Sequence, residues 1–427
     1  MDLIVAFIIT IALITIVSLK FKITPFFTLV GGAILFGLMA GMTLDATLKD
    51  IVSGLGRVFS AFGIIIFCGA VIAALLQEQH QTEEIVSDVQ RVVKNPPALA
   101  GFSGYLLAVP ITCCVTAYVM LNPILDCIEK DTAKRNILLY LAAVGSIISY
   151  ALIFPTPVVI PLFEAFSAGT SPLVYDAVAI PLSLAVLGGA ILFYRFTCPE
   201  ARGAGSSLQP CPAGTLTPIR PAGHGGIHWR AWAPFISILV AIPVSFLLGL
   251  SHVGIINFIM LAGAVTAIVL AAPVARTPGM TKGAKHAGMI IFDICGAGAL
   301  GYVIVHTGFT EGALQQMAPI IPVILIPFIL AALIETAQGS RVVTAVITAE
   351  VLAGSAVTSA IHPIPFILLI SAGSCLVSFV TDPYFWLVQR TTGDNIGTVV
   401  KKYTLPVALA GIGIFVVAIA LEYLVFR

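Results

Sequence analysis

Residues 136–163 read NILLYLAAVGSIISYALIFPTPVVIPLF and contain no charged side chain. About 20 apolar residues are enough for a helix to cross the hydrocarbon core of a bilayer, so this stretch predicts a membrane-spanning helix. Its end is unusual, because Phe154-Pro-Thr-Pro157 places two prolines inside the apolar run. Proline removes a helical hydrogen bond and breaks or kinks the helix. The stretch therefore predicts a span that ends in a break within the membrane.

The composition of the whole chain is also that of a membrane protein. Of its 427 residues, 59% are hydrophobic and 10% are charged, whereas about 25% of the residues in soluble proteins are charged. These values exclude a soluble enzyme, a nucleic-acid-binding protein and a disordered scaffold. The net charge of +1 predicts no electrostatic partner. Most of the eight cysteines lie in apolar runs, unlike the cysteines of a secreted disulfide framework.

Charged residues divide the chain into apolar windows, from which we expect ten full spans. Residues 3–19 lack a basic segment and a cleavage site, so they predict a retained span rather than a signal peptide. The charge-free windows are 3–19, 23–44, 58–77, 95–125, 136–163, 177–194, 231–275, 312–334, 351–381 and 403–421. The window 231–275 is long enough for two spans, and a further span at about 286–305 contains one acidic residue, Asp293.

The positions of lysine and arginine predict the orientation of these spans, because cytoplasmic loops are rich in both residues. We expect the protein to lie in the cell (inner) membrane, with its N- and C-termini on the outer side. This orientation places all 21 Lys and Arg residues on the cytoplasmic side, except Lys49, Arg57, Arg427 and the intramembrane Arg341.

The second half of the sequence repeats the first at an offset of about 226 to 228 residues. Residues 64–70 align with 290–297, allowing one gap, and residues 115–119 align with 343–347. The proline break at 154–157 aligns with Val380-Thr-Asp-Pro383. Chance similarity between apolar segments explains one match more easily than a constant offset across several.

Two regions, about 97–128 and 319–354, behave differently from full spans, because each is long enough for two half-depth arms around a polar break. Each predicts a re-entrant hairpin, so each repeat has five spans and one hairpin. An odd number of spans turns the second repeat upside down. The predicted fold class is an all-α polytopic membrane protein of two inverted repeats with broken helices at the midplane. Its parts are the first repeat, 1–197, the cytoplasmic linker, 198–229, and the second repeat, 230–427.

Two segments outside the spans carry their own patterns. Residues 82–94 place Ile85 and four valines on one helical face, which predicts an amphipathic helix at the membrane surface. The linker contains His224-Gly-Gly-Ile-His228, which is compatible with a metal site. No acidic residue or further histidine lies nearby in the sequence, so a plain loop is favoured and no metal is expected.

The breaks predict a binding site, because helix ends at the midplane expose free N–H groups that attract anions. Thr381-Asp382-Pro383 is typical of a helix start, with a capping side chain before proline. Thr156-Pro157 has the same pattern, and the hairpins break at Thr336-Ala-Gln-Gly-Ser340 and Val109-Pro-Ile-Thr-Cys-Cys114. Four converging helix starts favour a small anion, whereas proline kinks between packed helices are the alternative.

Arg341 marks this site most sharply, because an arginine at the bilayer midplane costs roughly 2.5–3.5 kcal/mol on insertion scales. Its guanidinium is suited to a carboxylate; the alternative is a structural ion pair with Glu335, Glu350 or Asp382. Asp382 and Asp293 are the candidates for proton coupling, and capping or pairing within the helix bundle is the alternative for Asp293. The Ser and Thr hydroxyls at these breaks are candidates for hydrogen bonds to substrate hydroxyls. The alternative is that each bonds only within its own helix. The candidate substrate-binding residues are Thr112, Cys113, Cys114, Thr156, Gln338, Gly339, Ser340, Arg341, Thr381 and Asp382.

At these motifs the sequence resembles the gluconate permease family of sugar-acid:proton symporters, within the ion-transporter superfamily. The likeness is greatest over Ala337–Ser340 with residues 343–348, and from Gly373 through Asp382 to Val388. The resemblance implies uptake of aldonates coupled to protons, and a transport domain that moves against a scaffold. The chain departs from the family pattern at Thr156, Phe379, Thr381, Arg341 and the Cys113-Cys114 pair, all near the predicted pocket.

The function predicted from these patterns is secondary active transport of a small organic anion, a hydroxylated monocarboxylate, driven by H+ or Na+. The expected partners are this anion and the lipid bilayer, with a homodimer left open and no cofactor, metal or nucleic acid. A sodium-coupled di/tricarboxylate carrier of the same superfamily is the alternative. Two other classes of function are less favoured. The sequence contains no nucleophile–base pair for an intramembrane enzyme, and re-entrant hairpins suit the occluded site of a carrier better than the permanent pore of a channel.

Overall fold

The computed structural model describes residues 3–21, 23–92, 95–109, 111–167, 169–199, 228–250, 252–309, 312, 321–379 and 382–426. Within these ranges the chain is helical and contains no strand. The helices of the first half are α1 (Leu3–Phe21), α2 (Pro25–Met39), α3 (Leu44–Glu78), α4 (Gln81–Val92), α5 (Pro96–Ala108), α6 (Cys114–Ile128), α7 (Thr132–Leu152), α8 (Val159–Phe166) and α9 (Pro172–Thr197).

The helices of the second half are α11 (Trp229–Leu247), α12 (His252–Leu270), α13 (Pro273–His306), α15 (Ile326–Gln338), α16 (Arg341–Leu352), α17 (Ala356–Ala360), α18 (Pro363–Ser374), α19 (Pro383–Thr392), α20 (Ile396–Val399) and α21 (Leu405–Leu424). A 3₁₀ turn, η1 (Val323–Leu325), precedes α15, and a π-helical turn, η2 (Val400–Thr404), precedes α21. Most of the predicted linker, residues 200–227, lies outside the described residues, as does Thr381.

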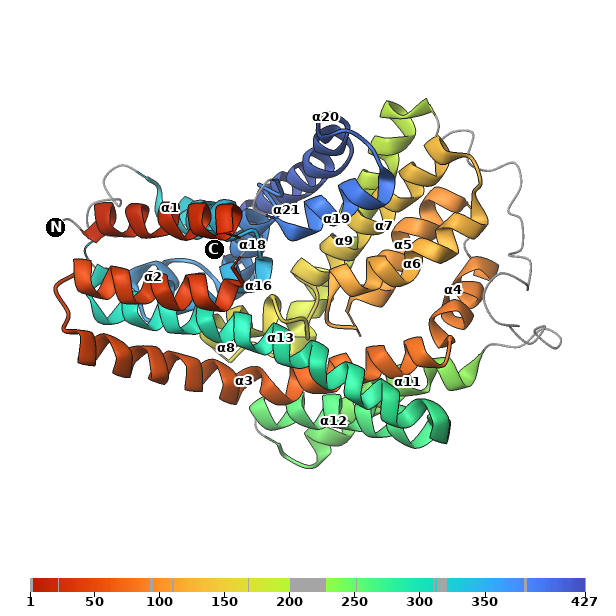
Figure 1. Ribbon diagram of the computed structural model, residues 1–427, viewed down its shortest axis with the longest axis horizontal. Coiled ribbons are helices and arrows are strands. Elements are labelled where there is room, and N and C mark those ends of the chain that lie inside the picture. The colour runs from red at the N-terminus through yellow and green to blue at the C-terminus, as the bar shows by residue number, and fades with distance from the viewer. Residues whose placement is uncertain are drawn as a thin grey trace.

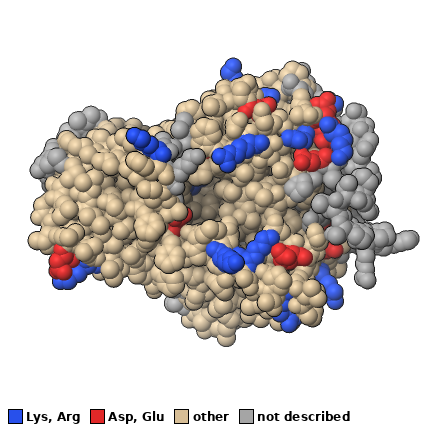
Figure 2. All heavy atoms as spheres, viewed as in Figure 1, with Lys and Arg blue, Asp and Glu red and all other residues tan. Residues whose placement is uncertain are grey.

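Four helices in the described ranges are long and apolar enough to cross a membrane: Thr132–Leu152, Pro172–Thr197, Pro273–His306 and Ile396–Leu424. The pair Leu44–Ser60 and Phe62–Glu78, bent by 49°, forms a fifth candidate span. Shorter apolar helices of 10–17 residues accompany them throughout the chain. Figure 2 shows broad areas of the surface that carry no Lys, Arg, Asp or Glu. This helix content is that of a multi-pass membrane protein, and the number of ten spans remains a prediction.

The helices pack in two groups. In the first group the long helices α3 and α13 lie side by side, α2 packs on α13, and α12 packs on α3 and α11 (Figure 1). In the second group α5, α6 and α9 pack on α7, and α18 packs on α15 and α21. Helix α16 joins the groups, because it contacts α13 as well as α8 and α15.

Glycines allow the two long helices to approach each other closely. A Cβ atom added to Gly54 of α3 would lie 2.6 Å from the backbone oxygen of Gly298 in α13. A Cβ atom on Gly283 would lie 2.7 Å from the Cα atom of Val71. Small residues at helix contacts are typical of membrane proteins, where close packing rather than water exclusion holds helices together. These contacts place α3 and α13 at the centre of the first group.

The order of the helices in the second half follows that in the first. Helix α3 has 35 residues and α13 has 34. Each is preceded by two apolar helices, and a pair of shorter helices comes later in each half: α5 with α6 after α4, and α15 with α16 after η1. Proline-containing breaks then precede α8 and α19. This shared order is compatible with the predicted repeat.

The predicted amphipathic segment forms helix α4, which is fastened to the start of α11 by one carboxylate. Asp88 Oδ2 accepts hydrogen bonds from the backbone N–H of His228 at 2.9 Å and from Trp232 Nε1 at 3.0 Å. Asp88 Oδ1 lies 2.8 Å from His228 Nδ1. The expectation that His228 has no acidic partner is therefore wrong, because the fold brings residues from both sides of the linker together. No third metal-binding side chain joins this pair among the described residues.

These contacts set the ionisation of Asp88, which lies outside the predicted spans. Removal of the carboxyl group from water raises its pKa, and the hydrogen bonds from His228 and Trp232 lower it by more. The pKa of Asp88 therefore lies below its usual value. A lowered folded-state pKa contributes stability that is present above the unfolded value, about 3.9, and is lost as the pH falls through the folded-state pKa.

We expect Asp88→Ala to destabilise the protein by ~2 kcal/mol, the usual contribution of hydrogen bonds to a buried charged group. Trp232→Phe removes one donor and is expected to cost less. Thermal unfolding in detergent measures both effects.

The same measurement from about pH 3 to pH 7 tests the ionisation of Asp88. The difference in unfolding free energy between wild type and Asp88→Asn should shrink below about pH 4. A difference that stays constant over this range would contradict the ionic role of Asp88.

Candidate functional site

The second hairpin turns at Gly339 and Ser340. Gly339 has φ +63°, a left-handed conformation that glycine adopts easily at a helix C-terminus, and its N–H donates to the Glu335 backbone oxygen at 2.7 Å. Ser340 is extended and does not cap with its side chain, while its backbone oxygen accepts from Thr344 N at 2.9 Å. Helix α16 therefore begins at Arg341 with free N–H groups near the hairpin tip. The side chain of Gln338 lies outside the described atoms.

Arg341 is buried and paired. Its Nη1 lies 3.6 Å from Asp382 Oδ2, and the two side chains are 4% and 2% exposed. Its Nη2 donates a hydrogen bond to the hydroxyl of Ser378. Its Nε has no hydrogen-bond partner in the described part of the chain. Of the three acids considered as ion-pair partners, Asp382 is the one in direct contact, whereas Glu350 pairs with Arg57 at 3.3 Å.

Asp382 receives two further hydrogen bonds. Its Oδ1 accepts from the backbone N–H of Tyr384 at 2.8 Å, so it caps α19 as the Asp-Pro pattern predicts. Its Oδ2 accepts from the hydroxyl of Tyr403 at 3.1 Å. The carboxylate thus joins the start of α16, the start of α19 and the turn η2.

Glu335 is a second buried carboxyl group close to Arg341. The residue is 0% exposed, and its Oε2 accepts from the Thr344 hydroxyl at 2.8 Å. Its Oε1 has no hydrogen-bond partner in the described part of the chain. Sequence reasoning named Glu335 only as a partner for Arg341 and missed it as a titratable group. The sequence signal that could have identified it is an acidic residue one helical turn before the Gly339-Ser340 tip.

The tip of the first hairpin lies against this cluster. Helix α6 begins at Cys114, and Cys113 Sγ caps it by accepting from Thr116 N at 3.4 Å. Cys114 is close enough to Arg341 and Asp382 for electrostatic interaction with both. Thr112, with φ +53°, is buried and donates its hydroxyl to the Ile111 backbone oxygen at 2.7 Å. The fold therefore brings Cys114 close to Arg341, while Cys113 caps its own helix and Thr112 bonds its own backbone.

The break at 154–157 is held by an aspartate that sequence reasoning missed. Asp176 of α9 accepts from the backbone N–H of Phe154 at 3.0 Å. Thr156 is buried, and its hydroxyl accepts from Val159 N at 3.4 Å, within its own break. Thr156 therefore shows the local bonding that was the alternative to a substrate contact. Nearby, a hydrogen bond of 2.9 Å between Ser146 Oγ and the Tyr384 hydroxyl joins α7 to the start of α19.

Asp293 lies in the other group of helices. Its Oδ1 accepts from the backbone N–H of Phe26 at 3.1 Å, in the first turn of α2. The N-terminal residue of that helix, Thr24, makes no side-chain cap. Asp293 therefore supplies the missing cap from α13, which is the bundle role considered for it.

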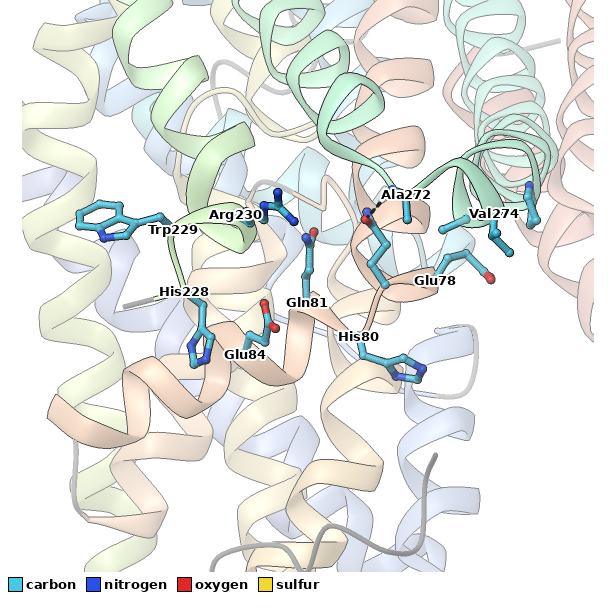
Figure 3. Close-up of a pocket in the computed structure, with 12 residues that line it drawn as sticks. Glu78, His80, Gln81, Glu84, His228, Trp229, Arg230, Ala272 and Val274 are labelled. Carbon is cyan, nitrogen blue, oxygen red and sulfur yellow. Dashed lines mark hydrogen bonds between the residues drawn. The ribbon is translucent and has the colours of Figure 1, made fainter. Parts of the chain in front are cut away.

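The structure also contains an open groove, which Figure 3 shows with the residues that line it. It has a volume of about 790 Å³, and residues from the end of α3, from α4 and from the starts of α11 and α13 line it, among them Glu78, Gln81 and Arg230. None of the candidate substrate-binding residues borders it. We place the candidate site at the Arg341 cluster, because buried charges there meet the helix starts of both predicted hairpins, α6 and α16.

Comparison with known proteins identifies relatives along nearly the whole chain. The family model described as GntP family permease matches residues 1–205 and 233–424. A high-affinity gluconate transporter of Escherichia coli (strain K12) is 23% identical over 423 residues, covering 92% of this chain and 93% of that protein. The Gnt-II system L-idonate transporter of the same organism is 24% identical over 435 residues, covering 94% and 95%.

Among solved structures, the YdaH transporter of Alcanivorax borkumensis superposes with a TM-score of 0.62 at 17% identity, covering 89% of each chain. At this identity the likeness shows the fold alone. The chain therefore shares an overall helical arrangement with a known transporter.

We expect Arg341→Ala to lose binding of a small organic anion, and Arg341→Lys largely to fail as well, because a point charge cannot replace the planar fork of arginine. Removal of Arg341 leaves two buried carboxyls without a cation, which typically costs about 3–5 kcal/mol. Binding of radiolabelled gluconate and thermal unfolding measure the two effects. The double variant Arg341→Met, Asp382→Asn removes both partners and should regain stability without binding. An Arg341→Ala protein that binds like wild type would make the arginine purely structural.

We expect a small maleimide to label Cys113 faster than Cys114, because Cys113 is half-buried and Cys114 is 6% exposed. Saturating gluconate should slow labelling of Cys113, since the thiol lies at the hairpin tip. Peptide mass spectrometry assigns the modified residue, and Cys113→Ser serves as the control. Labelling of Cys113 at a rate indifferent to bound anion would remove the first hairpin from the site. No labelling in any state would show packed, inert thiols.

Proposed function

The chain belongs to the GntP family of permeases, and from this premise we propose that it is a symporter that takes up a sugar acid such as gluconate together with protons. The family and the relatives above are permeases, so the protein is a transporter rather than an enzyme. Two of these relatives are described as transporters of gluconate and of L-idonate, and both compounds are sugar acids. Sugar acids carry one carboxylate and several hydroxyls.

The observation that carries the proposal is the buried guanidinium of Arg341 at the start of α16. A carboxylate can bind there to the guanidinium and to the free N–H groups of the helix start. The Nε of Arg341 is unpartnered in the described residues, so the guanidinium retains a donor for a ligand. Ser340, at the tip, is half-buried and uses no side-chain cap, which leaves its hydroxyl for a substrate hydroxyl.

In this proposal Gln338, Gly339, Thr381 and the first-hairpin residues complete the pocket around the substrate. Asp382 carries a charge that competes with the substrate for Arg341, so protonation at the cluster favours anion binding. This competition supports protons as the coupling ion. Asp293 supports coupling less well, because its carboxylate caps α2.

We infer that alternating access uses the two groups of helices. We propose that α3 and α13 with their neighbours form a scaffold, and that the hairpins move with α7, α18 and α21 against it. The repeated order of helices supports two inverted repeats, in which the hairpins enter from opposite sides. The proposal places the protein in the inner membrane with both termini outside, and association of two copies through the scaffold remains a prediction.

We expect purified protein in liposomes to accumulate radiolabelled gluconate when the outside is acidic, and a protonophore to abolish the accumulation. Replacement of sodium chloride by choline chloride should leave uptake unchanged. Uptake that requires sodium, or that prefers citrate or succinate over gluconate, would favour the sodium-coupled di/tricarboxylate carrier. Liposomes that contain the Arg341→Ala variant serve as the control. Counterflow of labelled substrate distinguishes a carrier from a channel.

A further inference from the structure

The charges of the buried cluster do not balance when both acids are ionised. Glu335 and Asp382 carry two negative charges, and Arg341 carries one positive charge that interacts with both. Within the described residues, the other titratable groups facing the cluster are tyrosines and cysteines, which carry no charge in their protonated form: Cys113, Cys114, Tyr150, Cys375, Tyr384 and Tyr403. An incoming carboxylate would add a third negative charge in a region of low dielectric constant. One acid must therefore hold a proton when the anion binds.

The hydrogen bonds show which acid that is. Asp382 accepts from Tyr384 N–H and the Tyr403 hydroxyl and faces Arg341 at 3.6 Å, which are contacts that an ionised carboxylate needs. Glu335 accepts one hydrogen bond, from Thr344, and its second oxygen is buried without a partner in the described part of the chain. An ionised carboxylate in such a place is far more costly than a neutral acid.

We propose that Glu335, rather than Asp382 or Asp293, binds the coupled proton. The inference rests on the proposed function and names the group through which that function is driven. A proton from the outside solution binds Glu335 Oε1, and Arg341, no longer shared between two carboxylates, binds the sugar acid. On the cytoplasmic side Glu335 releases the proton to water, and its regained charge competes for Arg341 and expels the anion.

The test uses the whole protein with radiolabelled gluconate as the probe. In the wild type, affinity should fall about tenfold per pH unit once Glu335 loses its proton, as expected for one linked proton. Glu335→Gln, a neutral mimic of the protonated acid, should bind with an affinity that does not change with pH. In liposomes it should retain counterflow and lose accumulation driven by a pH gradient. Glu350→Gln, which removes an acid from α16 beside Arg57, should behave like wild type.

A second variant tests Glu335 without changing it. Thr344→Val keeps the shape of the side chain and removes the hydroxyl that donates to Glu335. The pH midpoint of gluconate binding should move upward, because the ionised carboxylate loses its one hydrogen bond. A purely structural role for Glu335 would leave this midpoint unchanged.

The outcomes separate the two proposals. A wild-type protein that neither binds gluconate nor accumulates it with protons would overturn the proposed function. A wild type that does both, with a Glu335→Gln variant that still accumulates gluconate on a pH gradient, would overturn the assignment of Glu335 alone. A pH-independent Glu335→Gln variant beside an ordinary Glu350→Gln variant would support it. A Glu335→Gln protein that does not fold leaves the decision to Thr344→Val, in which an unmoved midpoint overturns the assignment.

Discussion

A guanidinium in the interior of a membrane protein must be surrounded by groups that replace water, and the structure around Arg341 is organised by this requirement. Asp382 supplies the counter-charge and Ser378 accepts a hydrogen bond. Asp382 in turn requires donors, which are the N–H of Tyr384 and the hydroxyl of Tyr403. Two helix starts and the π-helical turn η2 thus meet at one carboxylate. The broken helices are necessary here, because an unbroken helix has no free backbone groups to offer.

The network also explains the positions of less conspicuous residues. Tyr384 donates its backbone N–H to Asp382, while its hydroxyl bonds Ser146 of α7. The first half of the chain is therefore linked to the ion pair through one side chain. The thiol of Cys114, at the first hairpin, lies within electrostatic range of the same pair. Both polar and aromatic contacts join the halves near the site, because Tyr118 packs edge-on against Tyr384, whereas α3 and α13 approach each other closely at glycines.

The sequence predicted features that depend on neighbouring residues and missed those that depend on distant ones. The cap formed by Asp382 was predicted because Thr-Asp-Pro is a local signal, and the structure confirms it. The left-handed Gly339 follows equally from the Gln-Gly-Ser pattern. By contrast, Asp176 bonds Phe154, and Asp88 bonds His228 across the linker. No local pattern identifies such pairs, because only the tertiary fold brings them together.

Asp293 and Glu335 also show that the role of an acidic residue depends on contacts that the sequence does not reveal. Both are acidic residues within predicted membrane segments, but the sequence named Asp293 as a candidate for proton coupling and Glu335 only as an ion-pair partner for Arg341. The fold gives Asp293 a backbone partner at the start of α2 and leaves one oxygen of Glu335 without a partner in the described residues. Each acid accepts one hydrogen bond, so the difference between them lies in burial: Asp293 is half-buried, whereas Glu335 is 0% exposed and lies close to Arg341. A carboxyl group whose partners hold it ionised stabilises one conformation, whereas one with few partners changes its charge as its surroundings change. Proton-driven transport requires the second kind of group close to the cation that binds the substrate, and Glu335 meets both conditions.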